Sequence, residues 1–106
     1  MAQVPNSVIE IINNFLDSLK NDNIKISRAV LFGSYVKGNY DEYSDIDLAI
    51  VSEQFQGNFF YDNKIIQSSK LKTSCDLEVH TYQPDDFNDD NPFVREILSY
   101  GIELIK

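Results

Sequence analysis

The chain has 106 residues, 42% of them hydrophobic and 25% charged, so we expect a single domain, residues 1–106, with one modest core. Its 17 acidic and 9 basic residues give a net charge of −8, which excludes a nonspecific grip on nucleic acid because such binding needs Lys and Arg. Without an apolar run of membrane length, a signal peptide or a pair of cysteines, the sequence predicts no membrane role and a cytoplasmic location.

The first predicted element is a helix that starts near Ser7. Ser7 and Glu10 have the spacing of a capping box, and the polar run 21–23 predicts the end of the helix. The apolar residues recur at the spacing of one helix face: Val8, Ile11, Ile12, Phe15, Leu16 and Leu19.

Two strands with a turn between them are predicted next. The apolar run 27–32 predicts a strand that ends at Gly33, and residues 34–37 leave room for about one helical turn before Gly38. Residues 45–52 (DIDLAIVS) predict a second strand. Alternation gives this strand an apolar face and an acidic face, made of Ile46, Leu48 and Ile50 and of Asp45, Asp47, Ala49 and Val51.

The second half of the chain predicts two more helices and one or two more strands. Residues 59–72 favour a helix without a clear apolar face, and residues 74–82 (SCDLEVHTY) a third strand. The acidic segment 83–90 predicts a solvated loop or a single turn. Residues 91–101 have an asparagine cap, a proline in the first turn and a terminal glycine, and predict a helix. The last apolar residues, 102–105, read as a closing strand or coil.

This order of elements predicts an α/β (α+β) fold, a small mixed β-sheet flanked by helices. The short link between the first two strands favours an antiparallel pair, and the helix before the third strand can cross over to a parallel neighbour. Such a sheet would bring the turn at Gly33 and Ser34 to the same end as Asp45, Asp47 and Asp76.

Asp45 and Asp47 predict a site for divalent cations. Residues i and i+2 of a strand point to one side, about 7 Å apart, so both carboxylates can converge on one ion or on a pair. Hard oxygen ligands suit Mg²⁺ or Mn²⁺. Asp76 could supply a third carboxylate, or accept the proton of an attacking hydroxyl, and Glu78 on the same face competes for this role.

The turn at Gly33 predicts a phosphate site beside these carboxylates. A glycine lets backbone amides approach a ligand closely, and the short helix from Ser34 directs free N–H groups outward. The Ser34 hydroxyl adds a donor, and Lys37 with the backbone near Gly38 could contact the same anion.

Together, FGSYVKG, YSDIDLAIV and CDLEV resemble the signature of the DNA-polymerase-β-like nucleotidyltransferases. The short length and the final NPFVREILSYGIELIK most resemble the minimal nucleotidyltransferases of prokaryotes. The resemblance implies transfer of a nucleoside monophosphate from a nucleoside triphosphate to a hydroxyl, with two Mg²⁺ ions and release of pyrophosphate. It implies that Asp45, Asp47 and Asp76 hold the metals and that Gly33 and Ser34 bind the triphosphate. Lys37 stands where many relatives carry Arg, which keeps the charge but loses a bidentate donor.

Minimal members are often paired with a helical HEPN-domain protein as a toxin–antitoxin system. The resemblance therefore implies ATP as the nucleotide and a tyrosine of the helical partner as the acceptor. Two alternatives stay open: an antitoxin that covers a helical partner without chemistry, and an antibiotic nucleotidyltransferase, which the short chain disfavours. The surface that binds the acceptor could come from the partner or from a second copy in a homodimer.

Other polar residues are expected to have structural roles. We expect His80 to be a structural or exposed residue rather than a catalytic one, and Cys75 to be packed on the face opposite the aspartates. Tyr35 and Tyr40 flank the turn and could stack on a base, although packing is the expected role.

Overall fold

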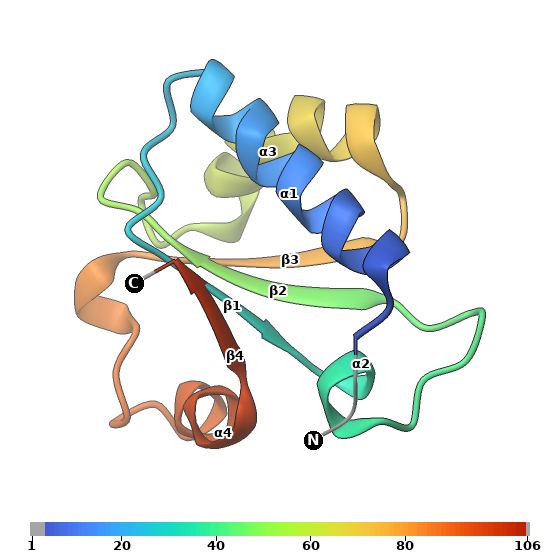
Figure 1. The fold of residues 1–106 in the computed structure, drawn as a ribbon. Coiled ribbons are helices and arrows are strands. Elements are labelled where there is room, and N and C mark those ends of the chain that lie inside the picture. The colour runs from blue at the N-terminus through green and yellow to red at the C-terminus, as the bar shows by residue number, and fades with distance from the viewer. Residues whose placement is uncertain (1–3, 106) are drawn as a thin grey trace.

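The computed structural model describes residues 4–105, which form one four-stranded sheet with helices on both faces (Figure 1). The elements in chain order are α1 (Asn6–Asn21), β1 (Arg28–Phe32), α2 (Ser34–Lys37), β2 (Ile46–Val51), α3 (Phe59–Thr73), β3 (Leu77–Tyr82), a 3-10 turn (Pro84–Asp86), α4 (Pro92–Tyr100) and β4 (Ile102–Ile105). The predicted α/β class is confirmed.

The sheet has the order β3-β2-β1-β4. Strand β1 is antiparallel to both β2 and β4, whereas β3 is parallel to β2 and is reached through α3. The antiparallel first pair, predicted from its link, and the parallel third strand, predicted from the helix that precedes it, are both confirmed. The end of β1 and the beginnings of β2 and β3 therefore lie at the same end of the sheet.

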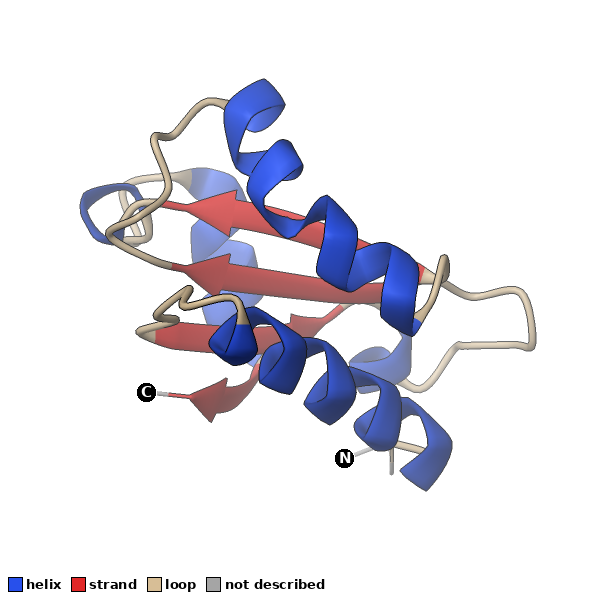
Figure 2. Cartoon of the chain, turned by 90° about the horizontal axis from the view of Figure 1, so that it is seen from above, coloured by secondary structure: helices blue, strands red, loops and turns tan. Residues whose placement is uncertain are grey.

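Helices α1 and α3 lie over one face of the sheet and α4 lies under the other (Figures 1 and 2). Side chains alternate between the two resulting cores because strand residues point to opposite faces in turn. On the first face, Leu31 and Leu48 pack with Phe15 of α1. On the second, Val30 and Ala49 pack with α4. The smaller α4 core leaves the acidic residues of β2 and β3 at its margin.

The helix ends show which local signals were decisive. Helix α1 begins at Asn6 with Pro5 at its cap position and no side-chain cap, so the predicted capping box at Ser7 is wrong. The cap of α4 is confirmed, because the Asn91 side chain accepts the Phe93 amide at 2.9 Å. Within residues 4–105, no helix has the length and apolar character that crossing a membrane requires.

Helix α3 has a weak apolar face because two of its buried residues, Asp62 and Ser69, are polar. The fully buried Asp62 accepts the backbone amides of Gln56 and Gly57, at 2.7 and 3.1 Å, and so holds the connection from β2 to α3. The other end of the helix leads to Cys75, which is exposed, so its predicted packing is wrong.

We expect Asp62→Ala to lower the free energy of unfolding by about 2–4 kcal/mol, because it leaves two amides without their acceptor. Asp62→Asn keeps one acceptor oxygen and is expected to cost less. Urea unfolding of both variants measures the difference, and equal costs would show that the one acceptor oxygen kept by Asn does not preserve the contacts with the two amides.

Candidate functional site

The candidate site lies where β1 ends and where β2 and β3 begin, on the face of the sheet that α4 covers. Asp47, the second residue of β2, is paired with Phe32 of β1 on one side and with Glu78 of β3 on the other. This register sets three side chains in a row across the sheet. Asp45 and Asp76 directly precede β2 and β3, so they lie at the same end of the sheet.

Asp47, Glu78 and His80 form a compact group of side chains able to ligate a metal. One ligand atom of each lies within 4.8 Å of the others. His80 Nε2 is 3.8 Å from Glu78 Oε1. Asp76 is exposed and is not one of the three. The pKa of Tyr35 is raised mainly by the burial of its ring and next by the negative charge of Asp76. The structure thus brings Glu78, the second candidate for the third carboxylate, into contact with Asp47.

The electrostatics of this group favour a bound cation. The pKa of Asp47 is raised from 3.8 to about 7, mainly by burial, then by a hydrogen bond to Glu78 and by the charges of Glu78 and Asp45. Burial lowers the pKa of His80, and the charge of Glu78 opposes that shift. Negative charge held partly out of water is stabilised by a divalent ion, and carboxylate oxygens are suitable ligands. The residues present therefore fit a divalent cation.

Gly33 closes the other side of the site. Its backbone has φ +79° and ψ −156°, a region open to glycine but not to other residues. A Cβ atom at this position would lie 2.0 Å from Asp47 Oδ2. The main chain of the turn therefore lies directly against the Asp47 carboxylate, and only a glycine fits there.

Helix α2 is the predicted single turn. It starts at Ser34, which is half-buried, and ends at Gly38 in the left-handed conformation, with φ +87°. The Lys37 amide donates to the Gly33 carbonyl at 3.1 Å, which tightens the turn. The residues predicted to bind phosphate thus lie on one short segment beside Asp47.

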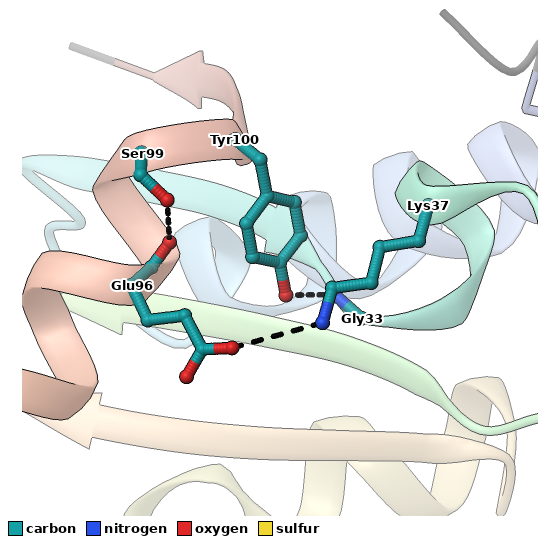
Figure 3. A network of polar contacts seen from close by, with 5 residues as sticks. All are labelled: Gly33, Lys37, Glu96, Ser99 and Tyr100. Carbon is teal, nitrogen blue, oxygen red and sulfur yellow. Dashed lines mark hydrogen bonds and ion pairs between the residues drawn. The ribbon is translucent and has the colours of Figure 1, made fainter.

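Helix α4 contributes side chains that sequence analysis missed (Figure 3). The Tyr100 hydroxyl accepts the Gly33 amide at 2.9 Å. Lys37 Nζ lies 4.8 Å from the centre of the Tyr100 ring and 3.7 Å from Glu96 Oε1. The hydroxyl of Ser99 donates to the Glu96 carbonyl at 2.6 Å. No local pattern marks these residues, because Tyr100 and Gly33 are 67 positions apart.

A cleft of about 340 Å³ joins these parts. Its walls are the turn at Gly33 and Lys37, the row that contains Asp47 and Glu78, and the side of α4 that carries Tyr100. It therefore has carboxylates on one wall and a lysine on another, charges of the two signs that a complex of a cation with a phosphate requires.

Comparisons with known proteins agree with this geometry. The sequence matches the nucleotidyltransferase domain family over residues 10–104. It is 31% identical over 103 residues to the "Putative protein adenylyltransferase MJ0141" of Methanocaldococcus jannaschii, covering 92% of this chain and 98% of that protein.

Two solved structures are also similar. One is described as the "Crystal structure of a putative nucleotidyltransferase from Sulfolobus solfataricus". Its TM-score is 0.65 at 15% identity, and the match covers 93% of this chain and 86% of that chain. This similarity supports the fold. A chain in the crystal structure of a toxin–antitoxin with AMP-PNP has a TM-score of 0.59 at 25% identity, with 86% of this chain and 70% of that chain covered.

Proposed function

Because the chain belongs to the nucleotidyltransferase domain family, we propose that it moves AMP from ATP to a hydroxyl group of a protein. The proposed acceptor is a tyrosine of a helical, HEPN-type partner that this chain neutralises as an antitoxin. Support comes from the similarity to a protein named as an adenylyltransferase and to a chain of a toxin–antitoxin complex.

One observation carries the proposal: the Gly33 turn lies directly against the Asp47 carboxylate, which itself contacts Glu78. An adenylyl transfer needs a cation and a triphosphate held side by side. The cleft lined by Gly33, Lys37, Asp47 and Glu78 supports this arrangement, because it sets carboxylates opposite a lysine. In this proposal Gly33, Ser34 and Gly38 contribute backbone contacts to the triphosphate, and Lys37 contributes its charge.

The proposed cation ligands are the carboxylates of Asp45 and Asp47, for two Mg²⁺ ions or for Mn²⁺. For the third carboxylate, the contact with Asp47 favours Glu78 over Asp76, which lies at the same end of the sheet but outside the group that Asp47 forms with Glu78 and His80. A bound divalent ion would supply Lewis acidity at the α-phosphate and neutralise charge on the leaving pyrophosphate.

The chemical step joins the acceptor oxygen to the α-phosphorus and breaks the bond between that phosphorus and the pyrophosphate oxygen. The proton of the acceptor hydroxyl passes to the third carboxylate, which we assign to Glu78. Lys37 and the amides of the Gly33 turn hold the departing phosphates, so that the reacting groups stay in line.

The test uses ATP labelled at the α-phosphate in one sample and at the γ-phosphate in another, each with Mg²⁺ and the helical product of the adjacent gene. We expect label to reach the partner only from the α-phosphate. Transfer from the γ-phosphate would reveal a kinase-type reaction. No transfer of either label, with Mg²⁺ or with Mn²⁺ in its place, would contradict the proposal.

The double variant Asp45→Asn with Asp47→Asn is the control. If this variant still protects cells from the partner, protection depends on binding and not on chemistry.

We expect Glu96→Gln to strengthen ATP binding about 2- to 5-fold, because it releases Lys37 from an exposed ion pair worth at most about 1 kcal/mol. Calorimetric titration with a non-hydrolysable ATP analogue measures the change. Glu10→Gln on α1 removes the same charge on the opposite side of the sheet and serves as the control. Equal gains in both variants would show an effect of net charge alone.

A further inference from the structure

We propose that Asp47, Glu78 and His80 form a mixed oxygen and nitrogen ligand set that binds a first-row transition-metal cation in preference to Mg²⁺. The proposal deepens the proposed function and rests on it only for placing a cation next to the nucleotide. Cation binding itself can be measured without nucleotide or acceptor, so the two proposals can fail separately.

The geometry brings three ligand atoms almost to the spacing that one ion needs. Two ligands of one cation are separated by at most twice the metal–ligand distance, about 4.2 Å for Mn²⁺ or Zn²⁺. The ligand atoms of Asp47, Glu78 and His80 already lie within 4.8 Å of one another. The Glu78 side chain is 54% exposed, so solvent leaves room for the small shift that remains.

The imidazole of His80 is held on the face of the sheet that carries the two carboxylates. Its ring centre lies 5.3 Å from that of Phe32 and 5.6 Å from that of Phe93, so it packs between β1 and α4. Its partner in the register is Ala49, whose small side chain leaves space for the ring. A ring restrained by packing loses little freedom when it binds an ion, which favours its use as a ligand.

The identity of the third ligand determines the preferred cation. Mg²⁺ binds carboxylate, phosphate and water oxygens and gains little from an imidazole. Imidazole nitrogen is a favourable ligand for Zn²⁺ and for other first-row transition ions. Two carboxylates with one imidazole should therefore discriminate in favour of Mn²⁺ or Zn²⁺ more strongly than the two carboxylates alone.

The first experiment titrates the nucleotide-free chain with Mn²⁺ and follows the electron paramagnetic resonance of free Mn²⁺, with Mg²⁺ as a competitor. We expect Mn²⁺ to bind at least about 10-fold more tightly than Mg²⁺, and His80→Gln to weaken Mn²⁺ binding about 10-fold but Mg²⁺ binding less than about 2-fold. Equal losses for the two ions, or no loss for Mn²⁺, would overturn the proposal.

The second experiment uses the fact that His80 is the only histidine of the chain. Its imidazole therefore gives a single set of nitrogen resonances, without ambiguity of assignment. We expect diamagnetic Zn²⁺ to shift the resonance of the ligating nitrogen and Mg²⁺ to leave it within its normal width. A resonance that saturating Zn²⁺ does not move would contradict direct ligation, whatever the effect of His80→Gln on affinity.

Two control variants separate this site from other places where a metal could bind. Cys75→Ser removes an exposed thiol that could capture Zn²⁺, so the titrations are performed in that background. Asp85→Asn changes a carboxylate of the exposed turn at residues 84–86 and should leave Mn²⁺ affinity unchanged. If Asp85→Asn weakens Mn²⁺ binding as much as His80→Gln does, the ion lies elsewhere and the proposal is wrong.

Discussion

Asp47→Asn is expected to reduce nucleotidyl transfer by about 1,000-fold or more while leaving the fold intact. The substitution removes the charge that we assign to cation binding, and Asn is nearly the same size as Asp. Asp47 is paired with Phe32 on one side and with Glu78 on the other, so no other side chain can take its place across the sheet. The loss should appear in kcat, because the cation acts on the reacting phosphate.

The same variant should be more stable than the parent chain above pH 7. The pKa of Asp47 is 3.8 in the unfolded chain and about 7 in the folded chain. Between these values the folded protein keeps a proton that the unfolded chain has released, so stability falls as the pH rises through this window. The whole penalty is present above about pH 7. Asn does not ionise and therefore escapes it.

Thermal unfolding between pH 4 and pH 8 measures this effect. The parent chain should lose more of its melting temperature over this range than Asp47→Asn does, and a saturating divalent cation should restore part of the loss in the parent only. Asp85→Asn, which changes an exposed carboxylate far from the cleft, is the control for a general effect of charge. If Asp47→Asn were less stable than the parent at pH 8, its carboxylate would be a stabilising group and the electrostatic account of the site would be wrong.

The topology of the sheet could be predicted because it depends on local features of the chain. The link between β1 and β2 holds only the single turn between Gly33 and Gly38 and no full crossover helix, which favours the antiparallel pair. The closing helix carried equally clear signals in Asn91 and Gly101, and both lie at the expected ends of α4. Where a residue type is needed for a particular backbone conformation, the sequence was informative.

The third carboxylate could not be chosen from the sequence, for a geometric reason. Asp76 and Glu78 are two residues apart, so alternation gives them the same face, and a shift of two residues in the register exchanges their positions. The pairing of Asp47 with Glu78 settles which of them lies beside the aspartate. Register depends on the packing of the whole sheet against α1 and α3, which no short pattern contains.

The contribution of α4 to the site was also beyond the reach of the sequence. Tyr100 and Glu96 lie on a helix whose apolar stripe predicts packing, but nothing in it indicates contact with Gly33 and Lys37. The role expected for His80 stays a prediction, but its place in the site could not be seen in the sequence. A lone histidine in a strand is most often structural, and only the fold reveals that it approaches Asp47.

Gly33→Ala is expected to lower the free energy of unfolding by about 2–4 kcal/mol and to abolish measurable transfer. The added Cβ would lie 2.0 Å from Asp47 Oδ2, so either the turn or the carboxylate must move. The backbone at φ +79° and ψ −156° adds strain for any residue with a Cβ. Both effects would separate the amides proposed to bind phosphate from the proposed cation ligands. The loss of activity should therefore exceed what partial unfolding explains when it is measured well below the melting temperature.

Gly57→Ala is the matched control, because it separates strain in the backbone from displacement of the site. Gly57 also has a positive φ, +75°, but its added Cβ would meet only the ends of the Gln83 and Asp86 side chains, at 3.3 Å. We expect this variant to lose about 1 kcal/mol of stability and to keep its transfer activity. Chemical denaturation and the α-phosphate transfer assay measure both variants under the same conditions. If Gly33→Ala kept its activity, the contact between the turn and Asp47 would not be needed, and the observation that carries the proposed function would lose its force.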